Sequence, residues 1–157
     1  MPLKPPPAPA AVPAGLDQSE LLGLVGYNCR RAYLSVVAGV VERLSGYGLS
    51  PAEFSVLSVI GGNPGSPQRA IADALAIAPP NLARLLDGLA ARGLVERLPH
   101  PQDRRAQALH LTASGRRAAR EALRAVQAAE RDALAGLEPA ERARLIALLQ
   151  RLFHPGG

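Results

Sequence analysis

Prolines and glycines divide residues 46–93 into consecutive short helices, and this division constrains the fold more than any other feature of the 157-residue chain. Ser50 is followed by a proline and then by Glu53, a pattern typical of a capped helix start in which both side chains bond to backbone N–H groups. Ser66 is also followed by a proline, so it predicts the cap of a second, shorter helix. A glycine- and proline-rich turn separates the two helices.

A third helix of this region, the fourth along the whole chain, is predicted from Pro79 through Arg92, with Gly93 as its C-terminal cap. Two adjacent prolines, Pro79 and Pro80, occupy its first turn, where backbone N–H groups have no partner within the helix, so little helix stability is lost. Residues 76–78 form a short turn before it. A short helix, a tight turn and a longer helix in this order predict a helix-turn-helix unit.

The spacing of apolar residues changes from helical to strand-like directly after this unit. Residues 94–98 and 106–111 have the pattern of two short strands, and the polar segment PHPQDRR between them carries Arg104 and Arg105 near its tip. A two-stranded hairpin that follows a helix-turn-helix is a wing.

The regions outside this unit are also predicted to be mainly helical. Residues 1–15 contain six prolines and predict a disordered tail. Residues 17–45 have apolar residues at helical spacing and predict one long helix, capped by Asp17 or Ser19. Such a helix is about 43 Å long. This length suggests that it packs on something besides its own small domain.

Two further helices are predicted in the C-terminal part, one from about Ala113 to Ala135 with Thr112 as its cap and one that starts near Pro139. The predicted fold class is mainly α with a small β wing, formed by six helices and one two-stranded hairpin. The predicted domains are a proline-rich tail at 1–15, a dimerisation helix at 16–47, a winged helix-turn-helix lobe at 48–111 and C-terminal dimerisation helices at 112–157.

The positive charge of the chain is concentrated in one segment. Residues 78–117 contain seven arginines and three acidic residues, which accounts for +4 of the net charge of +5. This concentration predicts a polyanionic partner; a solvated arginine-rich surface is the alternative. The single cysteine, Cys29, cannot close an intrachain disulfide, which favours a reducing, cytoplasmic location. The sequence predicts neither a membrane span nor a signal peptide.

Taken together, these segments resemble the MarR family of bacterial transcription regulators. The wing pattern of that family is Asp, then Lys or Arg, then Arg, with Leu-Thr some residues later, and it appears here at 103–105 and 111–112. Residues 84–98 look like the family's recognition helix running into the first wing strand. The resemblance covers residues 16–153. The sequence departs from the family at Ala78, where Ser or Thr often caps the recognition helix, and at the proline pair.

The resemblance implies an obligate homodimer in which the first, fifth and sixth helices of two chains intertwine. It implies binding to double-stranded DNA with a palindromic operator, with half-sites about one turn of DNA apart. The predicted function is a sequence-specific regulator, a repressor of neighbouring genes that is released by a small ligand such as an aromatic carboxylate. We expect no catalytic activity, cofactor or metal, because no nucleophile arrangement, phosphate-binding loop or metal-ligand cluster is present.

The predicted base contacts lie at the start of the third helix of the helix-turn-helix region. Asn81 can pair with adenine and Arg84 with guanine in the major groove, while Pro80 offers an apolar edge to a thymine methyl group. The alternative is that both polar residues are simply solvated. With two prolines in the first turn, we expect base recognition to depend on Asn81 and Arg84, with little help from free N–H groups.

Three further arginines are predicted to contact DNA. Arg104 and Arg105 lie where a wing reaches the minor groove, although Asp103 or Asp87 could instead hold one of them as a brace. The resemblance suggests that Arg105 is the structurally tied residue. Arg69 could reach phosphates from the preceding helix or be an ordinary surface arginine.

The predicted ligand site lies on the first long helix, where Tyr27, Arg31 and Tyr33 are close in sequence and Phe54 could supply a wall. Several MarR-type regulators that answer to aromatic carboxylates use an arginine of the first helix as an anion clamp, and the planar guanidinium of Arg31 suits that role. An ion pair, with the partner chain or on the surface, is the alternative for Arg31.

Two other functions remain possible from the sequence. Cys29 suggests a redox-sensing regulator, although a single helical cysteine more often serves as a small apolar side chain. The second possibility is a helical winged-helix module for protein interaction, without specific DNA binding.

Overall fold

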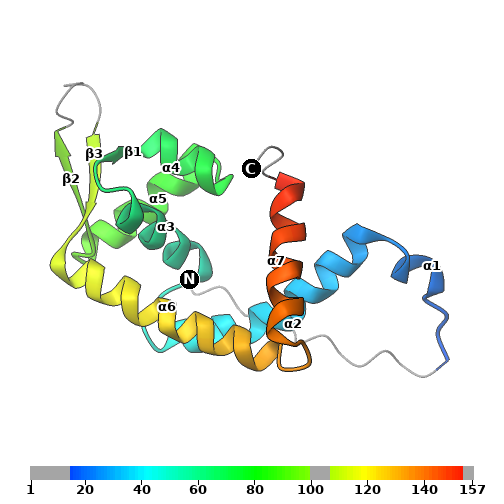
Figure 1. The fold of residues 1–157 in the computed structure, drawn as a ribbon. Coiled ribbons are helices and arrows are strands. Elements are labelled where there is room, and N and C mark those ends of the chain that lie inside the picture. Colours follow the sequence, from blue (N-terminus) through cyan, green and yellow to red (C-terminus); the bar gives the residue numbers. More distant parts are fainter. Residues whose placement is uncertain (1–14, 100–106, 154–157) are drawn as a thin grey trace.

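The computed structural model describes residues 15–99 and 107–153. The described part contains seven helices and three strands (Figure 1). In chain order they are α1 (Ser19–Leu22), α2 (Val25–Ser45), α3 (Pro51–Gly62), β1 (Ser66–Pro67), α4 (Gln68–Leu75), α5 (Pro79–Ala91), β2 (Val95–Pro99), β3 (Gln107–Leu111), α6 (Ala113–Ala133) and α7 (Pro139–Phe153). The predicted fold class, mainly α with a small β wing, is confirmed, and α4 and α5 form the helix-turn-helix unit.

The elements from α3 to β3 pack together as one lobe, and α6 runs along one side of it next to α2 (Figure 1). The core of the lobe is apolar and tightly closed. Leu44 from α2, Leu57 and Ile60 from α3, and Leu86 and Leu89 from α5 are all fully buried in it. Burying a leucine or isoleucine side chain stabilises a fold by about 1.5–3 kcal/mol. Helices α2 and α6, which both contribute residues to this core, are therefore joined to the lobe through it.

Local capping signals correctly predicted two helix starts, at Ser50 and at Thr112, whereas α1 has Gln18 at its N-cap without a side-chain cap bond instead of the predicted Asp17 or Ser19. The hydroxyl of Ser50 accepts the N–H of Glu53 at 3.2 Å, and the carboxylate of Glu53 accepts the N–H of Ser50 at 2.7 Å, which forms the predicted capping box. The hydroxyl of Thr112 accepts an N–H from the first turn of α6 at 3.0 Å. Asp17 accepts the N–H of Ser19 at 2.9 Å, and this bond lowers the pKa of the Asp17 carboxyl.

The prediction of one uninterrupted helix over residues 17–45 is wrong, because the chain breaks between α1 and α2. Leu24 has an extended backbone, with φ −99° and ψ 125°, which ends the helical hydrogen bonds next to Gly23. The amide of Asn28 donates to the carbonyl oxygens of Leu22 and Leu24, each at 2.8 Å. The side chain of Asn28 thus joins the end of α1 to the start of α2, at a site where glycine already weakens the helix.

The prediction that Ser66 caps a helix is also wrong. Ser66 and Pro67 form the short strand β1, which pairs antiparallel with β3 so that Ser66 lies opposite Leu109 and Pro67 opposite Ala108. The sheet therefore has three strands in the order β1-β3-β2 instead of being a simple hairpin. Helix α4 starts at Gln68, directly after Pro67, and has no side-chain cap, because the backbone of Ser66 pairs with β3.

Helix α7 stands away from the lobe (Figure 1), and none of its residues, Pro139–Phe153, is buried. Its apolar side chains are exposed, with Leu152 at 66% and Phe153 at 64%. The segment around α1 is similar, because Leu16, Leu22 and Leu24 are all more than half exposed. No helix in the described part of the chain is long and apolar enough to span a membrane.

Candidate nucleic-acid interface

Helix α5 begins at the two prolines, as predicted. Ala78 precedes the helix, and Pro79 and Pro80 occupy its first two positions. The next two N–H groups, of Asn81 and Leu82, both donate to the carbonyl oxygen of Ala78, at 2.9 and 3.1 Å. The first turn of α5 therefore has no backbone N–H left to bind a phosphate, in contrast to an ordinary helix N-terminus.

The two faces of α5 differ sharply. Leu82, Leu86 and Leu89 are fully buried against the lobe, whereas Asn81 and Arg84 are exposed on the opposite side. The guanidinium of Arg84 donates to the amide oxygen of Asn81 at 3.3 Å. The structure thus brings together two of the residues predicted to contact bases, on a helix whose other face is fixed by the core. The predicted neighbour Pro80 is also exposed.

The turn before α5 is short and has an unusual backbone. Ala76 has a left-handed conformation with φ +50°, which L-amino acids with a side chain rarely adopt. Two hydrogen bonds hold this conformation, from the N–H of Ala76 to the oxygen of Asp73 at 3.2 Å and from the N–H of Ile77 to the oxygen of Ala72 at 3.0 Å. They satisfy the last carbonyls of α4 and fix the angle between the two helices.

The C-terminal end of α5 is capped as predicted. Gly93 has φ +66° and donates its N–H to the oxygen of Ala90 at 2.9 Å, while the N–H of Leu94 donates to the oxygen of Leu89 at 3.0 Å. This pair of bonds is the Schellman arrangement, in which glycine takes the left-handed position. It turns the chain directly from α5 into β2.

The wing strands β2 and β3 pair antiparallel, with Val95 opposite Leu111 and Pro99 opposite Gln107. Arg97 of β2 forms an ion pair with Asp87 of α5 at 2.6 Å, which sequence reasoning missed. The sequence offers Asp87 as an ion-pair partner for Arg104 or Arg105, and in the structure Asp87 pairs with Arg97. The predicted residues Arg104 and Arg105, together with Asp103, lie outside the described residues.

Arg69, the predicted phosphate contact on α4, is 93% exposed and lies 4.0 Å from Asp73. Such a long, solvated i,i+4 pair holds the side chain weakly. Its role as a DNA contact stays a prediction.

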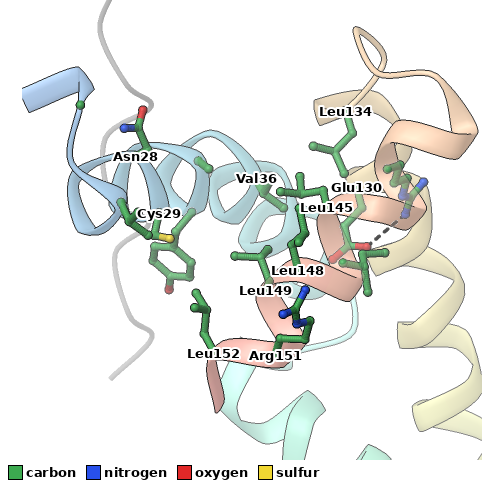
Figure 2. Close-up of a pocket in the computed structure, with 16 residues that line it drawn as sticks. Asn28, Cys29, Val36, Glu130, Leu134, Leu145, Leu148, Leu149, Arg151 and Leu152 are labelled. Atoms are coloured by element: carbon green, nitrogen blue, oxygen red, sulfur yellow. Dashed lines mark hydrogen bonds and ion pairs between the residues drawn. The ribbon is translucent and has the colours of Figure 1, made fainter. Parts of the chain in front are cut away.

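A groove of about 940 Å³ lies between α2 and α7 (Figure 2). Cys29, Tyr33 and Val36 line it from α2, and leucines of α7, among them Leu145 and Leu149, line it from the other side. Its walls are mostly apolar. Cys29, the single cysteine of the chain, is a free thiol that lines this groove, and its redox role stays a prediction.

Of the four residues predicted to bind a ligand, only Tyr33 lines this groove. The hydroxyl of Tyr27 donates to the side-chain oxygen of Gln18 at 2.9 Å. Phe54 packs against the core of the lobe, and Arg31 is half-buried on α2. Three of the four residues therefore lie outside this groove, and the predicted ligand site stays a prediction. Among residues 15–99 and 107–153 no group of three or more His, Cys, Asp or Glu side chains could hold a metal ion.

Comparison with known proteins supplies the family. A sequence profile of the MarR family matches residues 47–106. A protein of Thauera aromatica, described as a transcriptional regulatory protein for the hcr operon, is 33% identical over 147 residues, which cover 90% of this chain and 89% of that protein.

Solved structures agree with this assignment. The transcriptional repressor CouR bound to a 23-mer DNA duplex is 36% identical, with a TM-score of 0.82 over 88% of this chain and 99% of CouR. CouR from Rhodococcus jostii RHA1 bound to p-coumaroyl-CoA has a TM-score of 0.78 and 29% identity over 90% of this chain and 99% of that one. With this similarity along nearly its whole length, the chain belongs to the MarR family of transcription regulators.

Proposed function

We propose that this protein is a transcriptional repressor that binds DNA with α5 and the wing. The likeness to CouR in its DNA-bound form carries this proposal, since it extends over 88% of the chain at 36% identity. The exposed Asn81 and Arg84 supply the chemistry at the matching place, because amide and guanidinium groups form paired hydrogen bonds with adenine and guanine. The role is binding without catalysis, and a regulator of chromosomal DNA acts in the cytoplasm.

The active form is a homodimer. Helix α7 and the segment around α1 expose leucines that an isolated chain leaves in water, and covering them is the natural driving force for association. Two lobes related by a twofold axis match a palindromic operator, whose half-sites lie about 34 Å apart. In this arrangement residues 16–47 and 112–157 supply the dimer contacts and residues 48–111 the DNA contacts.

The effector is an aromatic acid or its coenzyme A thioester. CouR binds p-coumaroyl-CoA, which combines an aromatic ring with an anionic carrier. In this chain Tyr27, Tyr33 and Phe54 supply aromatic surface and Arg31 a cation, and a second chain next to α2 and α7 would complete their surroundings. Binding of the effector changes the spacing of the two lobes and thereby weakens DNA binding.

A DNA-selection experiment tests this function. The purified protein is incubated with random duplexes and with fragments of its own genome, and bound DNA is sequenced. We expect a palindromic sequence that is bound with an affinity that falls steeply as salt rises. Binding of all duplexes with equal affinity would contradict the proposal.

The effector is tested on the selected duplex. Addition of p-coumaroyl-CoA, p-coumarate or free coenzyme A shows whether the thioester, the acid or neither releases the DNA. Light scattering measures the dimer in the same samples. Release by none of the three compounds would remove the aromatic effector class while leaving the DNA-binding function intact.

A further inference from the structure

The lobe is joined covalently to the helices outside it at two places, and both places contact the same end of α5. Residues 46–50 connect α2 to α3, and Thr112 connects β3 to α6. In Figure 1, α6 begins directly at the base of β2 and β3, where α5 ends. The contact residues are Arg92, the C-cap residue that directly follows α5, and the next two residues, Gly93 and Leu94.

The first contact is an ion pair that also belongs to the start of α3. Nη1 of Arg92 lies 3.1 Å from one carboxylate oxygen of Glu53. The other oxygen of Glu53 accepts the N–H of Ser50 at 2.7 Å and the hydroxyl of Ser50 at 2.8 Å. The Glu53 side chain is only 19% exposed, so its interaction with Arg92 is partly shielded from water. One carboxylate thus joins the end of α5 to the connector from α2.

The second contact is a set of hydrogen bonds from the start of α6. The hydroxyl groups of Thr112 and Ser114 both donate to the carbonyl oxygen of Gly93, at 2.7 and 2.8 Å. The N–H of Thr112 donates to the oxygen of Leu94 at 3.1 Å. Helix α6 lies so close to the turn between α5 and β2 that a Cβ added to Gly115 would lie 1.9 Å from the oxygen of Leu94. The end of α5 is therefore fixed to α6 through backbone atoms.

The geometry of α5 makes this end a pivot. The helix has 13 residues and is about 20 Å long at a rise of 1.5 Å per residue. A tilt of about 10° at the C-terminal end moves the backbone by about 3 Å at Asn81, near the other end, and by about 2 Å at Arg84, near the middle. These displacements exceed the range over which a hydrogen bond to a base survives.

We infer that Glu53, Arg92 and Ser114 are positioning residues that set the angle of α5 against DNA and transmit movements of α2 and α6 to it. This inference rests on the proposed DNA-binding function. It assigns a role to residues that themselves contact no DNA. Arg92 acts through α5, and Glu53 and Ser114 act through Arg92 and Gly93.

The variant Glu53→Gln tests the inference, because a positioning role and simple electrostatics predict opposite changes in DNA affinity. Glutamine also forms the capping box with Ser50, so α3 keeps its start while the ion pair to Arg92 is lost. The variant is more positive than the wild type and releases a cation near α5. Simple electrostatics therefore predicts tighter DNA binding, whereas a positioning role predicts weaker binding.

The measurement compares affinity for the DNA sequence that the wild type selects with affinity for a scrambled duplex of equal length. For Glu53→Gln we expect a loss of roughly tenfold on the selected sequence and a change below about twofold on the scrambled one. Glu42→Gln is the matched control. Glu42 is an exposed residue of α2 whose carboxylate pairs with no cation among the described residues, and this variant should bind both duplexes like the wild type.

Ser114→Ala tests the α6 contact independently, with Ser35→Ala as its control, because the Ser35 hydroxyl bonds only within α2. Ser114→Ala should lose affinity for the selected sequence alone, and it keeps the test valid if Glu53→Gln fails to fold. Wild-type affinity of folded Glu53→Gln and Ser114→Ala for the selected duplex would overturn the inference. A wild type that selects no sequence would overturn the proposed function, and the inference with it.

Discussion

Asp87 of α5 and Arg97 of β2 form an ion pair with a nitrogen–oxygen distance of 2.6 Å. The pair ties the middle of the proposed recognition helix to the first strand of the wing. Arg97 is the more enclosed partner, at 29% exposure, and its Nε atom is buried without a hydrogen bond in the described structure. Asp87 is therefore the main counter-charge for a guanidinium that is partly removed from water.

Replacement of Asp87 by Asn should lower the free energy of unfolding by about 1 kcal/mol, the upper end for a partly exposed pair. Urea unfolding followed by circular dichroism measures this change. Asp73→Asn is the control, because its pair with Arg69 is longer and almost fully solvated, and it should be neutral. Equal effects of the two substitutions would show that the Asp87–Arg97 pair has no special contribution.

Replacement of Asn81 or Arg84 by Ala should reduce discrimination between the selected operator and single-base variants of it. Each lost contact between a side chain and a base should cost roughly 1–3 kcal/mol of discrimination, at one base position in each half-site. Competition binding with a set of duplexes, each altered at one position, measures this effect. A uniform loss over all positions would instead identify the two side chains as phosphate contacts.

Replacement of Arg69 by Ala should have the opposite signature. A lost phosphate contact weakens binding equally on operator and scrambled DNA and lowers the slope of log affinity against log salt by about 0.9 for each contact. Fluorescence anisotropy at several salt concentrations gives the slope. An unchanged slope would make Arg69 an ordinary surface residue.

The left-handed Ala76 predicts a stabilising substitution. Glycine adopts φ +50° without the steric cost that a side chain brings, and Ala76→Gly should raise the free energy of unfolding by about 0.5–1 kcal/mol. Ala74→Gly, in the helical part of α4, should lower it by about 1 kcal/mol. Chemical unfolding of both variants checks the prediction. It fails if the two substitutions change the free energy of unfolding in the same direction.

The close contact at Gly115 predicts a destabilising substitution. A Cβ at 1.9 Å from the oxygen of Leu94 and 2.9 Å from its carbonyl carbon must displace backbone atoms. Gly115→Ala should therefore lower the free energy of unfolding by about 1–3 kcal/mol. Gly88→Ala on α5 has open space around its added Cβ and should stabilise the helix by about 0.5–1 kcal/mol. Thermal unfolding compares the two, and a stable Gly115→Ala would contradict the close packing.

The parts of the fold that the sequence could predict depend on neighbours within a few residues. The capping box of Ser50 and Glu53, the proline start of α5 and the cap at Gly93 are such local features, and the structure confirms them. The break before α2 was missed because apolar spacing continues through it, although Gly23 weakens the helix there and the amide of Asn28 bonds the carbonyl oxygens of Leu22 and Leu24.

Features that depend on distant partners were not predictable. Ser66 has a good capping sequence, but pairing with Leu109 in β3 determines its conformation. In the site, the exposure of Asn81 and Arg84 follows from helical periodicity, whereas the pair of Arg92 with Glu53 joins residues 39 positions apart. Nothing in a single sequence marks these two side chains as partners.

The uncovered leucines of α7 have a consequence for the amount of protein a cell must hold. If a second chain covers them, folding and association form one equilibrium, and the midpoint of thermal unfolding rises with total concentration. Dilution then removes structure as well as partners. Expression level would thereby become a regulatory variable in its own right: below the dissociation constant of the dimer, a chain would lose its hold on the operator without any effector.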